Sequence, residues 1–167
     1  LARHLQAQGV QPGDRVAAYM PNITQSAIAM LACMSIGAVW SMCAPDMGTN
    51  AVLDRFQQIE PVVLIACDGV TYGGKDHNRL QVVQALRDGL PSVKHVIVCR
   101  NLNADATLAN SKDLDIILAR RSHAIDSFEP LWLPFDHPLW IVYSSGTTGL
   151  PKPIVHGHGG TLVIALA

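Results

Sequence analysis

The sequence has no surplus of charge of either sign, and it has little charge at all. Its 12 lysines and arginines nearly balance 13 aspartates and glutamates, so the formal net charge is −1 and charged residues make up 15% of the chain. A protein that neutralises many nucleic-acid phosphates needs a basic surplus. The composition therefore argues against a nucleic-acid partner, and the 49% hydrophobic content predicts one globular domain with a sizeable core.

Cysteine is scarce, and its spacing is not that of a metal site or a disulfide framework. Cys33, Cys43, Cys67 and Cys99 lie far apart, each in an apolar stretch, and no C-x-x-C pair is present. Disulfide frameworks are typical of shorter, loop-rich secreted chains. We therefore expect four reduced core cysteines, no metal ligand among them and a cytoplasmic location.

Acidic and basic residues are absent from residues 16–45. A span of this kind is long enough to cross a membrane as a helix. However, Gly37 divides it, Ser35 and Ser41 interrupt it, and its second part has the pattern of a strand. We expect a buried helix followed by a buried strand and no membrane span, with a membrane-associated protein as the alternative.

The hydrophobic pattern predicts strands that alternate with helices. The expected strands are residues 15–20, 39–43, 62–67, 93–99 and 139–143, and the expected helices are 3–8, 22–36, 51–59, 80–90 and 113–119, with another beginning at 161. Asn22 and Asn50 are the expected N-caps, and Asp68 and Gly69 are expected to end a strand. This alternation predicts an α/β fold of βαβ units around a mostly parallel, buried sheet.

Residues 144–152, with the sequence Ser-Ser-Gly-Thr-Thr-Gly-Leu-Pro-Lys, follow directly after the last of these strands. A loop of this kind offers backbone N–H groups, hydroxyl donors and one cation at a single point, which is what a polyphosphate needs. The residues expected to bind phosphate are Ser144, Ser145, Gly146, Thr147, Thr148, Gly149 and Lys152. An ordinary surface turn is the alternative, but the ordered pattern after a strand favours a nucleotide triphosphate.

The loop is not a Walker loop, because Leu150 and Pro151 separate Gly149 from Lys152. Pro151 and Pro153 lie on either side of Lys152. Each proline fixes its own φ and favours an extended shape in the residue before it. We therefore expect Lys152 to be presented on a stiff, non-helical segment.

Residues 143–152 resemble the phosphate-binding signature of the acyl-adenylate-forming superfamily, the AMP-dependent synthetases and ligases. The flanking segments narrow the resemblance to the subgroup that activates acetoacetate; they are residues 40–48, 53–56, 58–61, 136–140 and 156–160. In most members of the superfamily a glycine follows the motif lysine, whereas this chain has Pro153. We take this departure to favour the acetoacetate-activating subgroup.

The resemblance implies a ligase that joins acetoacetate to ATP as an acyl-adenylate, releases diphosphate and passes the acyl group to coenzyme A. In such a ligase the loop and Lys152 stabilise the departing pyrophosphate, and Mg²⁺ neutralises the phosphates. Residues 1–167 would then be an internal fragment of the adenylating N-terminal domain, without the small C-terminal lid domain. We expect this fragment alone to be inactive.

A second site is implied at Tyr72, Gly73, Gly74 and Lys75. This stretch is similar to the Arg-Gly-Gly-Arg segment with which acetyl-CoA synthetases contact a coenzyme A phosphate. The resemblance implies that Gly73, Gly74 and Lys75 bind coenzyme A and that Tyr72 stacks on its adenine. A solvated glycine turn explains the same residues equally well.

Two further segments have more than one interpretation. His156 and His158 occupy alternate positions, which would place both on one side of a strand, but without a third ligand nearby we favour a structural or hydrogen-bonding role over a metal. Residues 40–48 either line the acyl or pantetheine channel at a strand end or hold a buried Trp40 followed by a turn.

Besides the membrane-associated protein, two alternative functions remain from the sequence. One is the same chemistry on another short or medium carboxylic acid, and the other is a noncatalytic nucleotide-binding module. Pyrophosphate release that depends on an added acid would distinguish a ligase from both the module and the membrane-associated protein.

Overall fold

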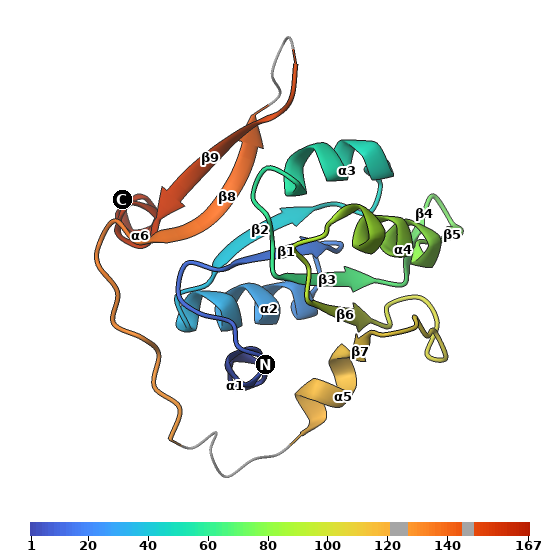
Figure 1. Ribbon diagram of the computed structural model, residues 1–167, viewed down its shortest axis with the longest axis horizontal. Coiled ribbons are helices and arrows are strands. Elements are labelled where there is room, and N and C mark those ends of the chain that lie inside the picture. Colours follow the sequence, from blue (N-terminus) through green and yellow to red (C-terminus); the bar gives the residue numbers. More distant parts are fainter. Residues whose placement is uncertain (121–126, 145–148) are drawn as a thin grey trace.

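A central sheet organises the protein, as the computed structural model of residues 1–120, 127–144 and 149–167 shows (Figure 1). Within these residues seven strands form one sheet in the order β7-β6-β3-β1-β2-β8-β9. Their bounds are β1 Arg15–Tyr19, β2 Val39–Cys43, β3 Val63–Cys67, β6 His95–Cys99, β7 Lys112–Asp113, β8 Pro138–Ser144 and β9 Lys152–Gly157. Neighbouring strands pair in parallel, except for β8 and β9, which pair antiparallel. The α/β prediction with a mostly parallel sheet is confirmed.

Helices cover both faces of the sheet (Figure 1). The helices α1 Ala2–Ala7, α2 Thr24–Ser35 and α5 Leu114–Ala119 pack against one face, and α3 Thr49–Phe56 and α4 Leu80–Gly89 pack against the other. The side chains of β1 alternate accordingly, with Val16 and Ala18 in the first core cluster and Ala17 and Tyr19 in the second. Burial on both faces explains why these strands are apolar throughout.

The uncharged span of residues 16–45 folds into β1, α2 and β2, as expected. No helix of the described residues has the length and apolar character to cross a membrane. Cys33, Cys43, Cys67 and Cys99 are free and buried, which agrees with the prediction.

Both predicted asparagine N-caps are wrong. Helix α2 begins at Thr24, two residues after Asn22, and neither its N-cap Ile23 nor any other side chain caps it. Helix α3 begins at Thr49 with Gly48 as N-cap, so Asn50 already lies within the first turn. An N-cap is the nonhelical residue just before the helix, and its side chain accepts a hydrogen bond from an N–H group of the first turn. Neither asparagine occupies that position.

A hairpin that the sequence did not predict follows β3. Strands β4 Gly69–Tyr72 and β5 Lys75–Asn78 pair antiparallel. Gly73 and Gly74 form the turn between them, with φ values of 58° and 73°. Two consecutive positive φ values are typical of the tight hairpin turns that favour glycine.

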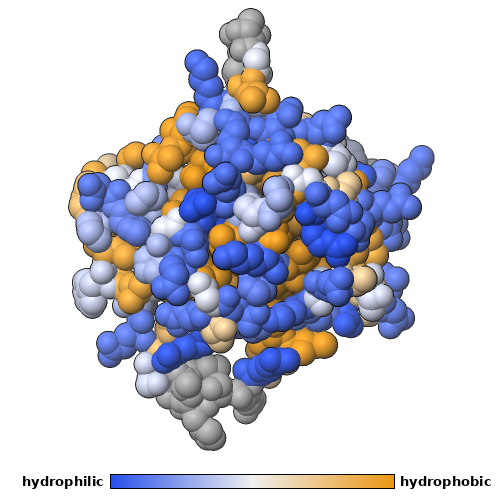
Figure 2. Space-filling model, viewed as in Figure 1, coloured by the Kyte–Doolittle hydropathy of each residue, from blue (hydrophilic) through white to orange (hydrophobic). Residues whose placement is uncertain are grey.

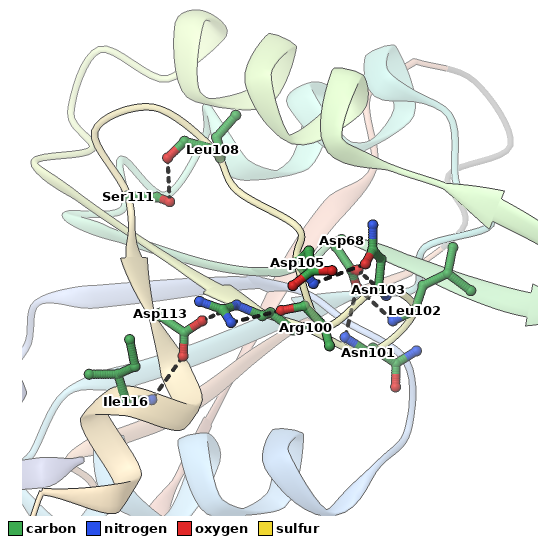
Figure 3. A network of polar contacts seen from close by, with 11 residues as sticks. Asp68, Arg100, Asn101, Leu102, Asn103, Asp105, Leu108, Ser111, Asp113 and Ile116 are labelled. Atoms are coloured by element: carbon green, nitrogen blue, oxygen red, sulfur yellow. Dashed lines mark hydrogen bonds and ion pairs between the residues drawn. The ribbon is translucent and has the colours of Figure 1, made fainter.

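A buried carboxylate joins the base of this hairpin to the loop after β6 (Figure 3). Asp68 is 1% exposed and accepts hydrogen bonds from the N–H groups of Asn101, Leu102 and Asn103 at 2.7, 2.9 and 2.7 Å. The Asn101 amide also donates to the Gly69 carbonyl oxygen at 2.8 Å. A buried charge is costly unless it is hydrogen-bonded, and these donors stabilise it while holding the hairpin at the sheet edge.

Tyr19 holds the loop after β2. Its buried hydroxyl lies 2.7 Å from the Pro45 carbonyl oxygen and 3.0 Å from that of Met47. Burial raises the pKa of Tyr19 to about 12, so the hydroxyl remains a donor at neutral pH. The loop at residues 44–48 is therefore fixed at the carboxyl end of β1 and β2.

We expect Tyr19→Phe to lower the free energy of unfolding at pH 7.5 by about 1–2 kcal/mol, because the Pro45 carbonyl oxygen loses its buried donor and the half-buried Met47 carbonyl oxygen loses its contact with the same hydroxyl. The pKa of Tyr19 is about 12 in the folded protein against an ordinary 10.0, so the native state retains the proton more strongly between these values. Its contribution is therefore full below pH 10 and is lost as the pH rises through 12.

Urea unfolding at pH 7.5 and pH 11 checks this, and the gap between wild type and Tyr19→Phe should narrow at pH 11. The control is Tyr72→Phe at pH 7.5, since Tyr72 is 78% exposed on the hairpin, and we expect a change within about 0.5 kcal/mol. An equal or wider gap at pH 11 would contradict the assignment.

Candidate functional site

The predicted phosphate loop lies where the carboxyl ends of the parallel strands meet. Ser144 is the last residue of β8, and Lys152 is the first residue of β9 and pairs with Ser144 in register. Because β8 is parallel to β2, its end reaches the same edge as the ends of β1, β2, β3 and β6. Open α/β sheets bind their ligands at this edge.

The structure describes only part of the loop. Ser144 is half-buried at the end of β8, and Gly149 has a φ of 104°, which favours glycine. Lys152 is exposed, and none of the ion pairs in the described part of the chain involves it, so its ammonium group can meet an anion. The other predicted phosphate-binding residues lie outside the described residues; they are Ser145, Gly146, Thr147 and Thr148.

Helix α3 and the turn after it support the base of the loop. The Tyr143 hydroxyl donates to the Arg55 carbonyl oxygen at 2.8 Å, and the Gln58 amide donates to the Pro151 carbonyl oxygen at 2.9 Å. Burial raises the pKa of Tyr143 to about 12, so its hydroxyl stays protonated. No motif pointed to Gln58 or Arg55 as neighbours of this loop, although both lie in segments that carried the family resemblance.

The residues proposed for coenzyme A lie on the β4–β5 hairpin. Tyr72 pairs with Lys75 across the turn, and both side chains are exposed. The hairpin leaves the sheet at the carboxyl end of β3, so it shares the ligand edge with the phosphate loop. Strands β1 and β2 lie between β3 and β8, so the two sites are not side by side. The hairpin geometry accounts for both glycines, and both interpretations of the stretch remain possible.

The segment at residues 40–48 divides into two parts. Trp40 is 3% exposed within the core, which agrees with a buried tryptophan followed by a turn. The residues after β2 lie at the ligand edge, where Tyr19 fixes them. Any contact with an acyl or pantetheine group would therefore come from residues 44–48.

The two histidines do not share a strand, so that prediction is wrong. His156 belongs to β9, but His158 is the first residue of α6 His158–Leu166, which begins before the expected residue 161 because the chain turns at Gly157. The rings of His158 and His137 lie 5.7 Å apart, and burial, followed by the charge of His137, lowers the pKa of His158. Among the described residues no three His, Cys, Asp or Glu side chains gather to hold a metal.

An apolar groove of about 560 Å³ lies at the opposite end of the β8–β9 hairpin. Its lining includes Leu131, Trp132, Phe135, His158 and Leu162. Hydrophobic side chains are visible on the side of the molecule where β8, β9 and α6 lie (Figure 2). The groove is at the amino end of β8, and it does not belong to the candidate phosphate site.

Known proteins resemble the chain along its whole length. The chain is 45% identical to the acetoacetyl-CoA synthetase of Xenopus tropicalis, over 97% of this chain and 25% of that protein. It is 38% identical to the malonamoyl-CoA synthetase vrtB of Penicillium aethiopicum, over 95% of this chain and 23% of that protein. The chain therefore spans about a quarter of the length of these curated relatives.

The fold agrees with the sequence match. A solved structure of the acetoacetyl-CoA synthetase from Streptomyces lividans matches with a TM-score of 0.93 and 49% identity, over 99% of this chain and 25% of that one. The model of the AMP-binding enzyme family matches residues 1–167. The resemblance inferred from residues 143–152 is thereby confirmed, and the chain belongs to the AMP-binding enzyme family.

Proposed function

We propose that this chain supplies the phosphate-binding part of an acid–thiol ligase that activates acetoacetate with ATP and transfers the acyl group to coenzyme A. The observation that carries the proposal is the 45% and 49% identity, over nearly the whole chain, to two proteins named acetoacetyl-CoA synthetase. The position of the loop at the carboxyl end of β8 and the exposed Lys152 support it.

In the first step a carboxylate oxygen of acetoacetate attacks the α-phosphorus of ATP. The bond from the α-phosphorus to the bridging oxygen breaks, and its electron pair leaves with pyrophosphate. Charge accumulates on the departing group, where N–H groups, hydroxyls and one ammonium stabilise it if they are already in position. Lys152 would supply this ammonium, and Ser144 the first hydroxyl.

Magnesium, when bound with the nucleotide, would supply charge neutralisation at the phosphates. The hydroxyl oxygens of Ser144, Ser145, Thr147 and Thr148 are hard donors of the kind that Mg²⁺ accepts.

In the second step the thiol of coenzyme A loses its proton to solvent, its sulfur attacks the acyl carbonyl carbon, and AMP leaves with the electron pair of the broken acyl–oxygen bond. We propose that Lys75 pairs with a coenzyme A phosphate, with Gly73 and Gly74 allowing close approach. The exposed tip of the β4–β5 hairpin at the ligand edge supports this role.

We further propose that the residues for adenine, ribose and the lid lie outside residues 1–167, since the chain covers 25% of the Xenopus protein.

We also propose a cytoplasmic location, because the four cysteines are buried free thiols, which a reducing compartment preserves. Burial raises the pKa of Cys43 and Cys67 to about 11, which keeps both thiols protonated.

A second candidate function is the same chemistry on another small acid, favoured by the 38% identity to a protein named malonamoyl-CoA synthetase.

In the full-length protein that carries this chain, we expect pyrophosphate release to depend on added acid. Acetoacetate should exceed acetate, butyrate, 3-hydroxybutyrate and malonamate in kcat/KM by about tenfold or more. Preference for another acid would favour the second candidate, and release without acid would contradict both.

Replacing Lys152 should slow adenylation. We expect Lys152→Ala to lower the rate of acetoacetate-dependent ATP–pyrophosphate exchange by about 100-fold, the usual effect of losing one preorganised charge donor. The matched control is Lys94→Ala, because Lys94 is also exposed but precedes β6, at the amino edge of the sheet. An exchange rate equal to that of the control would refute the role of Lys152.

Replacing Lys75 should affect only the thioester step. We expect Lys75→Ala to raise the KM for coenzyme A about fivefold, in keeping with one exposed charge-assisted contact, and to leave ATP–pyrophosphate exchange unchanged. Dephospho-CoA, which lacks one phosphate, tests the contact from the ligand side. If the KM for coenzyme A does not change, the hairpin is only a solvated turn.

A further inference from the structure

Both ends of the phosphate loop contact one short segment, made of the carboxyl end of α3 and the turn after it. Tyr143 precedes the loop and donates its hydroxyl proton to the Arg55 carbonyl oxygen at 2.8 Å. Pro151 lies at the far end, and its carbonyl oxygen accepts from the Gln58 amide at 2.9 Å. Arg55 lies in the last turn of α3 and Gln58 lies in the turn that follows the helix, so one short segment holds the two ends of the loop.

Helix α3 is itself held firmly in the fold. Val52 and Phe56 are fully buried against the sheet. On the α4 side, a Cβ added at Gly89 would lie 2.8 Å from Cδ2 of Leu53, which shows how closely the two helices approach. Contacts with the end of α3 therefore connect the loop to the core of the domain.

A second hydrogen bond, to the end of α3, orients the Gln58 side chain. Its amide nitrogen carries two hydrogens, and besides Pro151 it donates to the Asp54 carbonyl oxygen at 2.6 Å. That carbonyl lies in the last turn of α3, where helix carbonyls lack intrahelical partners. The two hydrogen bonds of one amide group thus connect the helix end to the loop.

The Tyr143 ring is also fixed from two sides. The Arg55 guanidinium carbon lies 5.7 Å from the centre of the ring, and Nη1 of Arg55 donates to the Ala51 carbonyl oxygen at 2.6 Å. The cation and the hydroxyl contact hold the ring against α3 at its face and at its tip.

We propose that Gln58 and Tyr143 are positioning residues that hold the two ends of the phosphate loop on α3. This inference rests on the proposed function. Neither side chain needs to touch the nucleotide. Their effect is to place Lys152 and Ser144 where the pyrophosphate leaves, because electrostatic stabilisation requires donors that do not have to reorganise.

A purely structural role explains these contacts less well. The hairpin has its own backbone pairing, with Ser144 opposite Lys152 and Tyr143 opposite Pro153. Figure 1 shows that the outer ends of β8 and β9 extend beyond the rest of the sheet, near α3. The pairing holds the hairpin together, whereas the contacts with α3 determine where its end lies.

The test uses Gln58→Met and Tyr143→Phe in the full-length protein, since both keep the approximate side-chain shape and remove the polar group that donates. We expect each to lower kcat/KM for ATP in the exchange reaction by about threefold to tenfold, the effect of one net hydrogen bond. The KM for acetoacetate should stay within about twofold, because the loop does not bind the acid.

Gln57→Met is the matched control, because Gln57 is the preceding glutamine and donates to the Gly89 carbonyl oxygen at 3.0 Å, away from the loop. It should retain wild-type kcat/KM for ATP, and all three variants should unfold at similar temperatures.

The outcomes separate this inference from the proposed function. If Gln58→Met and Tyr143→Phe retain wild-type kcat/KM for ATP while Lys152→Ala loses activity, the positioning role is wrong and the proposed function stands. An equal loss in Gln57→Met, or an equal rise in the KM for acetoacetate, would also overturn the positioning role. If Lys152→Ala itself is fully active, the proposed function fails.

Discussion

The candidate site depends on the pairing of β8 with β2. Within the described residues β8 has two strand neighbours, β2 and β9, so β2 is its link to the rest of the sheet. The register places Trp40 opposite Trp140 and Ser41 opposite Ile141, and the buried Ser41 hydroxyl donates to the Ile141 carbonyl oxygen at 2.9 Å. This parallel pairing brings a loop from late in the chain to the edge where the first strands end.

The scarcity of charge agrees with this architecture. A sheet covered on both faces leaves little room for charged side chains within, and residues 16–45 carry none. Two of the charges that do enter have partners: Asp68 accepts from three N–H groups, and Arg100 forms an ion pair with Asp113 (Figure 3). Lys152, by contrast, is exposed at the ligand edge, where a cation is useful to a phosphate.

The parallel sheet also explains how two proposed sites share one edge without touching. Each site continues a different strand, the phosphate loop from β8 and the Gly73–Gly74 hairpin from β3, with β1 and β2 between them. The carboxyl ends of β1 and β2 therefore lie between the two proposed sites. There the Tyr19 hydroxyl holds residues 44–48 through the carbonyl oxygens of Pro45 and Met47.

The sequence by itself determined the alternation of the main strands and helices, the buried sheet and the family, because the hydrophobic period and the loop at residues 144–152 are local signals. It did not reveal the β4–β5 hairpin or the short strand β7. The predicted strand 39–43 coincides with β2. The predicted N-caps Asn22 and Asn50 were wrong, because the first residue of a helix depends on the path of the chain between the preceding strand and the helix. Only the tertiary structure decided that α3 supports the loop, because the contacts of Gln58 and Tyr143 join residues 93 and 88 positions apart, and no local pattern records such pairs.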